Sequence, residues 1–170
     1  MRINAFALLV FMIYLVHGPS VLAQNSVQPP VTQQPILTAD GKGVQIYTCQ
    51  NVSGVLQWAF QAPEAKLFDT SGKEIGTHSA GPIWKVQDGS SVKGQLVEKS
   101  DAPEPGNIPW LLLKAAGHEG AGILSKVEYI RRSETHGGIA PASGCDAEHL
   151  DVTVRIPYTA MYTFYAPHVE

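Results

Sequence analysis

Strong charge of either sign is missing from this 170-residue sequence, which has 12 Lys and Arg residues against 15 Asp and Glu. A protein that binds nucleic acid or an anionic membrane usually carries a marked basic excess. Here the formal net charge is -3, and it becomes -4 if Arg2 is removed, because 11 basic residues then face the same 15 acids. We therefore expect neither nucleic acid nor an anionic membrane surface as the main partner.

Long apolar runs are also scarce, and the one near the N-terminus is short. It follows Met1-Arg2, extends from Ile3 to Val16, and is followed by a segment that ends at Ala23. A membrane-spanning helix needs about 20 apolar residues, whereas one early positive charge, a short apolar stretch and small residues are typical of a secretory signal peptide. We expect residues 1–23 to be a signal peptide, no membrane span, and a secreted or periplasmic mature protein.

Cysteine is rare, since Cys49 and Cys145 are the only two. In an exported protein an even pair predicts a disulfide, whereas a catalytic thiol would have to remain free. A bridge that closes a loop on the order of 100 residues stabilises a fold by up to about 4.7 kcal/mol in the chain-entropy model. We predict a Cys49–Cys145 disulfide.

A helical period of apolar residues is absent beyond residue 35. Short segments rich in β-branched and aromatic residues recur instead, with Asp, Gly, Ser and Pro between them. They include residues 43–50, 56–61, 65–69, 110–116, 123–131 and 151–165. This pattern predicts an all-β fold, a single-domain antiparallel β-sandwich or closed β-barrel of about nine or ten strands. We expect the domain at 36–170 after a flexible proline-rich arm at 24–35, with a small helical turn near residues 145–150 that Asp146 would cap.

Several motifs of catalysis and cofactor binding are absent or incomplete. The sequence has no Gly-x-Ser-x-Gly nucleophile elbow. Gly120 and Gly122 resemble the start of a dinucleotide-binding loop, but the residues that follow alternate like a strand, whereas that loop requires a helix. His118-Glu119 lacks the second histidine of a zinc-protease helix, because position 122 is glycine. We assign no catalytic residue, expect no cofactor, and favour a protein that is not an enzyme.

Two glycine-containing segments are candidates for a binding site. The segment "GTHSAGPIW" surrounds His78 with glycine and proline and ends at Trp84, whose ring could stack on a sugar or an apolar ligand if exposed and would belong to the core if buried. The segment "GHEGAG" places a His-Glu pair in a tight connection between two expected strands. Our candidate binding residues for a small ligand, a glycan or an envelope component are His78, Trp84, His118 and Glu119.

Two alternative functions remain open from the residues alone. In a metal-assisted enzyme, histidines from separate loops would gather around zinc or copper, with Glu119 as general base. Those histidines are His78, His118, His136 and His149. In a purely structural extracellular protein the same loops would be only turns. The triplet Asn51-Val52-Ser53 is an N-glycosylation acceptor if the host is eukaryotic, and nothing in the sequence indicates an oligomeric state.

The order of several sequence blocks resembles a known family. The blocks are "GVQIYTCQ", "APEAKLFD", "GTHSAGPIW", "IPWLLLKA", "GGIAPASGCD" and "IPYTAMYTFY". In this order they are similar to a family of exported bacterial and fungal proteins catalogued as a domain of unknown function, over nearly the whole mature chain. The resemblance implies no established activity, and the residues give no basis for the malate dehydrogenase label that some fungal relatives carry. Ser79, Ile83 and Met161 depart from the family pattern, in which an aromatic residue, threonine and an acid are common at these positions.

Overall fold

The computed structural model describes residues 27–168, so the expected signal peptide at 1–23 lies outside the described residues. These residues form eight strands and one short 3-10 helix. The strands are β1 (Gln33–Val52), β2 (Val55–Phe68), β3 (Glu74–Ser79), β4 (Ile83–Val86), β5 (Ser91–Ser100), β6 (Trp110–Glu119), β7 (Tyr129–Gly137) and β8 (Thr153–Pro167), and the helix η1 (Ile123–Lys126) lies between β6 and β7. Of the segment expected to be an arm, Val27 is buried and residues from Gln33 onward belong to β1. No helix in this part of the chain is long and apolar enough to cross a membrane.

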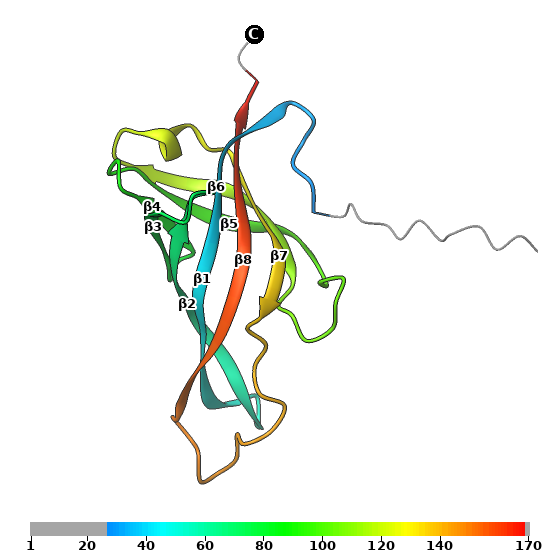
Figure 1. Ribbon diagram of the computed structural model, residues 1–170. Helices are drawn as coiled ribbons and strands as arrows, with labels where there is room; N and C mark the ends of the chain where they lie inside the picture. Colours follow the sequence, from blue (N-terminus) through cyan, green and yellow to red (C-terminus); the bar gives the residue numbers. More distant parts are fainter. Residues whose placement is uncertain (1–26, 169–170) are drawn as a thin grey trace, which may run out of the picture.

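The eight strands form one antiparallel sheet that closes on itself. Each strand pairs with its neighbours along the chain, and β1 pairs with β8 to complete the ring. The predicted all-β fold is therefore confirmed, in its closed-barrel form (Figure 1). The buried aromatic and aliphatic side chains of the sheet form one core inside the ring.

The strand count is eight rather than the nine or ten expected, because two prolines do not end the strands that contain them. Pro63 continues β2 and pairs with Gln45, and the pairing of β2 with β3 starts only at Ala65. Pro157 continues β8 in the same way, since the pairing of β8 with β7 starts at Tyr158. A proline has no N–H for a sheet hydrogen bond. Each therefore lies where its strand is paired on one side only.

Two further local expectations were wrong. The strand expected at 123–131 begins at Tyr129, because residues Ile123–Lys126 form η1. The helical turn expected at 145–150 is not a helix, although Asp146 does act as a turn acceptor there: its backbone oxygen accepts from the His149 amide at 3.1 Å, and its Oδ1 accepts from the Glu148 amide at 3.0 Å.

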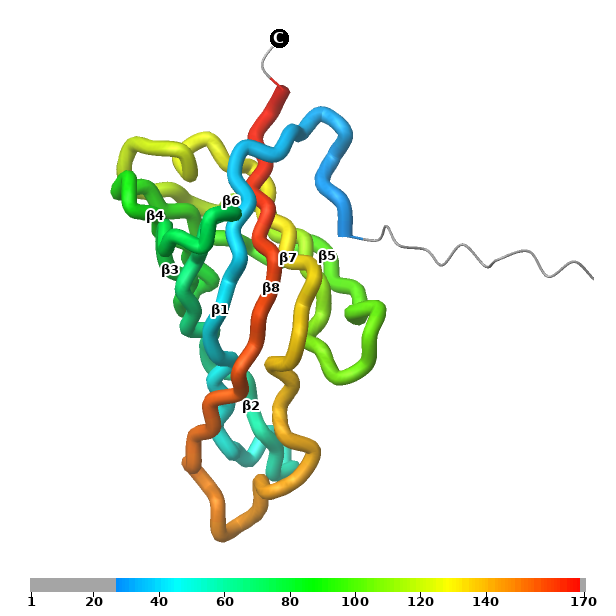
Figure 2. The backbone as a smooth tube through the Cα atoms, viewed as in Figure 1, coloured from blue at the N-terminus to red at the C-terminus, as the bar shows by residue number. Residues whose placement is uncertain are grey.

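The strands differ in length, and as a result the hairpin formed by β1 and β2 extends beyond the other strands of the barrel. β1 and β8 have 20 and 15 residues, whereas β3 and β4 have six and four. Figure 2 shows the turn between β1 and β2 at the end opposite the C-terminus, beside the orange segment that joins β7 to β8. The hairpin therefore needs support from that segment.

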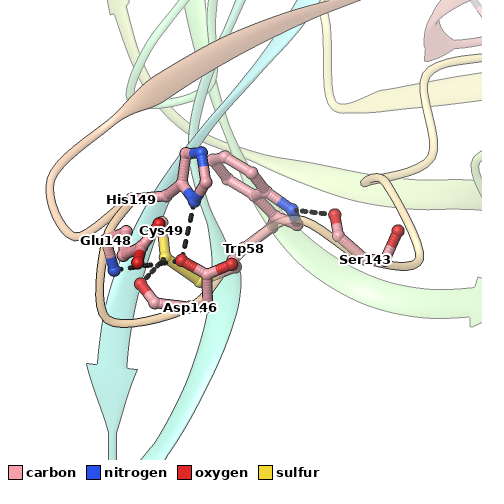
Figure 3. Close-up of a disulfide and its surroundings, with 7 residues drawn as sticks. Cys49, Trp58, Ser143, Asp146, Glu148 and His149 are labelled. Atoms are coloured by element: carbon pink, nitrogen blue, oxygen red, sulfur yellow. Dashed lines mark hydrogen bonds and ion pairs between the residues drawn. A yellow bond between two sulfur atoms is a disulfide. The ribbon is translucent and has the colours of Figure 1, made fainter.

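The predicted disulfide supplies this support. Cys49 in β1 is bonded to Cys145 in the segment between β7 and β8 (Figure 3). Two backbone hydrogen bonds hold the same segment against β1, from the Cys49 amide to Val152 and from the Asp151 amide to Cys49. Trp58 in β2 donates from Nε1 to the backbone oxygen of Ser143 at 2.9 Å. The segment is thus fixed to both strands of the hairpin.

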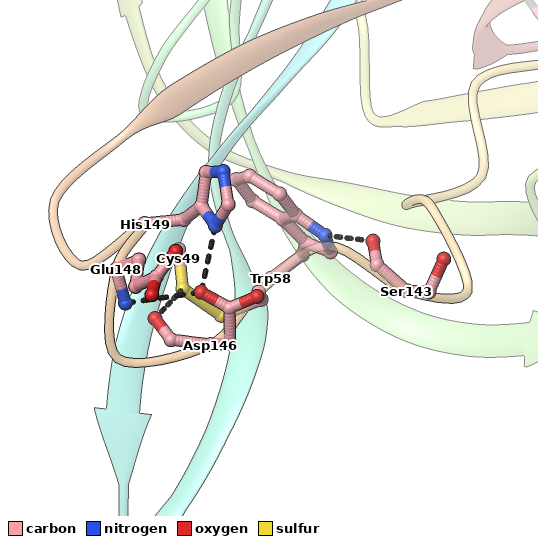
Figure 4. A network of polar contacts seen from close by, with 7 residues as sticks. Cys49, Trp58, Ser143, Asp146, Glu148 and His149 are labelled. Carbon is pink, nitrogen blue, oxygen red and sulfur yellow. Dashed lines mark hydrogen bonds and ion pairs between the residues drawn. A yellow bond between two sulfur atoms is a disulfide. The ribbon is translucent and has the colours of Figure 1, made fainter.

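A polar network within this segment involves one of the candidate metal-binding histidines. His149 donates from Nδ1 to the Asp146 carboxylate at 2.6 Å, and the Glu148 amide donates to the same oxygen (Figure 4). The hydrogen bond from His149 is the main reason why the pKa of Asp146 is lowered. His149 therefore stabilises a turn next to the disulfide.

We predict that removal of the disulfide lowers the free energy of unfolding by up to about 4.7 kcal/mol, because the loop that it closes spans 96 residues. The measurement is chemical denaturation of the oxidised protein and of the Cys49→Ser/Cys145→Ser double variant. As a control, a reductant should destabilise the first protein and leave the second unchanged. Equal unfolding free energies for the two proteins would contradict the stabilising role.

Candidate functional site

A row of paired residues across β1 to β5 shapes the interior. The residues, in order around the sheet, are Gly43, Ala65, His78, Trp84 and Val92. Directly paired residues lie on the same face of an antiparallel sheet. The two smallest residues of this row, Gly43 and Ala65, lie on β1 and β2, and a Cβ on Gly43 would collide with the backbone of Ala65. The two rings follow on β3 and β4 and stack with centroids 4.3 Å apart and an interplanar angle of 6°.

His78 is a buried, neutral member of this stack. Its Nδ1 lies 3.0 Å from the backbone oxygen of Ile83. A carbonyl can only accept, so Nδ1 carries the proton and Nε2 is left as an acceptor. Burial lowers the pKa of His78 to about 4. The ring is therefore uncharged near neutral pH.

Trp84 belongs to the core rather than to an exposed aromatic surface. It is 1% exposed, and the rings of Tyr162 and Phe164 approach it edge to face from β8. His78 stacks on its ring. His78 therefore occupies one face of the Trp84 ring, where a sugar would have to stack. The expected glycan-binding role of Trp84 required an exposed ring, and this ring is buried.

The other two candidate binding residues lie apart from this pair. His118 and Glu119 are exposed at the end of β6. His118 donates from Nε2 to the backbone oxygen of Val127 at 2.8 Å, so this nitrogen has a structural partner. Neither residue lines the cavity that His78 and Trp84 share. The structure thus brings together two of the four candidates and separates the other two from them.

Gly120 and Gly122, which follow His118 and Glu119, are explained by a close approach to another turn, whereas Gly117 has open space around it. The Asp88 carboxylate accepts hydrogen bonds from the amide and hydroxyl of Ser90 and from the amide of Ile123. The bond from the Ser90 hydroxyl is the main reason why the pKa of Asp88 is lowered, followed by the bond from the Ile123 amide. A Cβ on Gly122 would collide with this carboxylate, and one on Gly120 with the backbone oxygen of Gly89. The loop is therefore a structural connection, and the first amide of η1, that of Ile123, already donates to Asp88.

The histidines proposed as metal ligands are dispersed. His78 lies inside the barrel, His118 at the end of β6, His136 on β7 and His149 beside the disulfide. Within residues 27–168, no three side chains of the His, Cys, Asp or Glu type lie close enough together to hold a metal ion. The geometry of the described residues does not support the metal-assisted enzyme.

A cavity of about 240 Å³ extends from the surface into the barrel, and we call it the barrel cavity. Its inner wall includes His78, Trp84, Leu111 and Leu113, and its rim includes Pro82. Phe60 and Leu96 also line it and are 53% and 54% exposed. An apolar entrance therefore leads to an interior that is mainly apolar.

The wall of the barrel cavity contains two buried donors without acceptors. Gln45 and Trp84 are 3% and 1% exposed, and neither Gln45 Nε2 nor Trp84 Nε1 has a hydrogen-bond partner among the described residues. Burial raises the pKa of Tyr158, whereas the Tyr162 hydroxyl, the charge of Arg132 and the nearby Gln45 side chain lower it to a smaller extent. The Tyr158 and Tyr162 hydroxyls lie 3.0 Å apart, and burial raises both pKa values.

Arg132 adds a positive charge to this wall. It pairs with Leu111 on β6 and with Tyr162 on β8, and all three line the barrel cavity. Its Nε and Nη2 donate to the backbone oxygen of Pro109 at 3.1 and 2.7 Å. Sequence reasoning missed both Arg132 and Gln45. The alternation of side chains along each strand could have identified them. Arg132 is two positions from the apolar Ile130 and therefore shares its face of the strand, and Gln45 shares a face with Tyr47 and Cys49 in the same way.

We predict that His78 makes the protein less stable as the pH falls from 6.5 towards 4. Its pKa in the unfolded chain is about 6.5 and in the fold about 4, so only the unfolded chain binds a proton in this interval. The loss amounts to about 3 kcal/mol at the low end. His78→Gln, which keeps a donor for the Ile83 oxygen, should remove this part of the pH dependence.

The measurement is the free energy of unfolding from pH 7 to pH 4 for the protein and for His78→Gln. The carboxyls of Asp69, Asp88 and Asp146 have lowered pKa values, so their contributions are lost at still lower pH. Identical slopes for the protein and His78→Gln would show that His78 is not responsible.

Residues 30–166 match the model of the family described as "Protein of unknown function (DUF3455)". The match covers most of the chain, so the protein belongs to this family, in agreement with the resemblance seen in the sequence blocks. No curated protein and no solved structure matches the chain.

Proposed function

We propose that this member of the family is an exported binding module whose barrel cavity takes up a small, mainly apolar molecule that carries a hydrogen-bond acceptor. The observation that carries the proposal is the barrel cavity itself, with Phe60 and Leu96 exposed at its entrance and the unpartnered donors of Gln45 and Trp84 in its wall. The disulfide supports export, because such bonds persist in oxidising compartments.

The size of the barrel cavity limits the ligand. An engineered apolar cavity of about 150 Å³ accepts benzene, and drug-sized ligands occupy pockets of about 300–1,000 Å³. The barrel cavity, at about 240 Å³, lies between these values. The fitting ligand therefore has on the order of ten non-hydrogen atoms.

The polar groups of the wall determine which functional group the ligand carries. A buried donor without an acceptor costs about 1–3 kcal/mol. Gln45 Nε2 and Trp84 Nε1 are both donors, and Arg132 can only donate. A ligand with one or two acceptor oxygens would satisfy these donors once small side-chain movements uncover Gln45 Nε2 and Trp84 Nε1, whereas a hydrocarbon would satisfy neither.

The dispersal of the histidines favours binding over metal-assisted catalysis. His78, His118 and His149 are bonded to separate parts of the fold, namely the Ile83 oxygen, the Val127 oxygen and the Asp146 carboxylate. Within residues 27–168, no three side chains of the His, Cys, Asp or Glu type come together as metal ligands would.

We predict binding of at least one compound from a panel of octanol, octanoic acid, indole and naphthalene, measured by isothermal titration calorimetry. Gln45→Met should weaken the affinity for an acceptor-bearing compound about tenfold, because it removes a donor. The same variant should raise the Tm of the ligand-free protein by a few degrees, because the buried amide is no longer unsatisfied.

Gln95→Met is the matched control, because Gln95 is exposed on β5 and does not line the barrel cavity. It should change neither the affinity nor the Tm by a comparable amount. Failure of every compound to bind would refute the proposed function. A Gln45→Met variant that is less stable and binds equally well would show that Gln45 has a structural role only.

A further inference from the structure

We infer that the ligand is an apolar carboxylic acid whose carboxylate pairs with Arg132 inside the barrel. This inference rests on the proposed function and specifies the chemical class of its ligand.

The position of Arg132 in the sheet directs it towards the cavity. Leu111, Arg132 and Tyr162 are directly paired across β6, β7 and β8, so they share the inner face. The neighbouring Arg131 occupies the next position and therefore the other face, where its guanidinium lies 5.2 Å from the centre of the Trp110 ring. Two adjacent arginines thus have different surroundings.

The guanidinium of Arg132 is fixed in place but is not neutralised. Nε and Nη2 share the Pro109 oxygen, which holds the plane of the group, and the Tyr162 hydroxyl lies within reach of the same side chain. A guanidinium has five N–H groups, so some are left for a further partner. Of the carboxylates in residues 27–168, none lies within 4.0 Å of it, whereas Lys66 and Arg155 each have such a partner at the surface. Arg132 is partly buried, and burial makes an unpaired charge costly.

The titratable groups around Arg132 do not supply the missing negative charge. His78 on β3 is neutral near pH 7, and Tyr47, Tyr158 and Tyr162 on β1 and β8 have raised pKa values because they are buried. The charge of Arg132 acts on all four groups, which places it among them. An anion that balances it would therefore come from the ligand.

The remaining wall fits the two parts of such an acid. A planar guanidinium matches a carboxylate with two parallel hydrogen bonds. Gln45 and Trp84 line the same cavity, and each carries a buried donor that has no acceptor among the described residues. Leu111, Leu113 and the exposed Phe60 and Leu96 offer an apolar path from the interior to the entrance for the hydrocarbon part.

The test compares octanoate with octanamide, which has the same chain and no charge. Calorimetric Kd values are measured at pH 7 for the protein, for Arg132→Met and for the matched control Arg131→Met. Octanoate should bind the protein at least about tenfold more tightly than octanamide, because hydrogen bonds between charged groups are stronger. Arg132→Met should lose this preference, and Arg131→Met should keep it.

The possible outcomes separate this inference from the proposed function. Equal affinities of the unaltered protein for octanoate and octanamide would overturn the carboxylate inference and leave the binding function intact. No binding of any panel compound would refute both. A preference that survives in Arg132→Met would overturn the role of Arg132. If Arg132→Met does not fold, Arg132→Lys takes its place: a lysine lacks the planar fork, so the preference should fall, and an unchanged preference would overturn the inference.

Discussion

The pairing of β1 with β8 is the contact on which the rest of the structure depends, because it turns a meander of strands into a closed ring. It places Ala39 opposite Tyr162 and thereby brings the last strand to the side of the first. Without it, β1, which carries Gln45, would be separated from the wall that carries Arg132. The His78–Trp84 stack on the short strands then faces Tyr162 of β8 across the same interior.

Closure also creates a conflict between stability and function. An interior filled only with hydrocarbon would be more stable than one in which Gln45 Nε2 and Trp84 Nε1 lack acceptors. The guanidinium of Arg132 is bonded to the Pro109 oxygen but pairs with no carboxylate of the described residues. The long pairings of β1 and the Cys49–Cys145 bond offset this loss. In the binding function that we propose, the ligand would supply the partners that the chain omits, so the same polar groups that reduce stability would serve binding.

The sequence predicted those features that depend on local pattern. Alternation and turn residues predicted the all-β fold, and an even pair of cysteines predicted the disulfide. The number of strands was overestimated because Pro63 and Pro157 each predict a strand end. Only the pairing shows that each proline lies within a strand, at a point where that strand is paired on one side only. Two of four site candidates lie at the barrel cavity. Arg132 and Gln45 were missed because their proposed role in ligand binding depends on closure of the barrel, which brings β1 next to β8. The bond between Asp88 and Ile123 was missed because the two residues are 35 positions apart in the sequence.

The central claim is that the barrel cavity is a ligand site, and the indole N–H signals of the three tryptophans test it most directly. Trp58 already donates to Ser143, Trp110 has an unpartnered Nε1 but does not line the barrel cavity, and Trp84 has an unpartnered Nε1 and does line it. A ¹H–¹⁵N spectrum of the labelled protein is recorded during titration with octanoate. The account predicts a saturable shift of the Trp84 signal, with the other two unchanged. A Trp84 signal that stays in place while octanoate binds would contradict it.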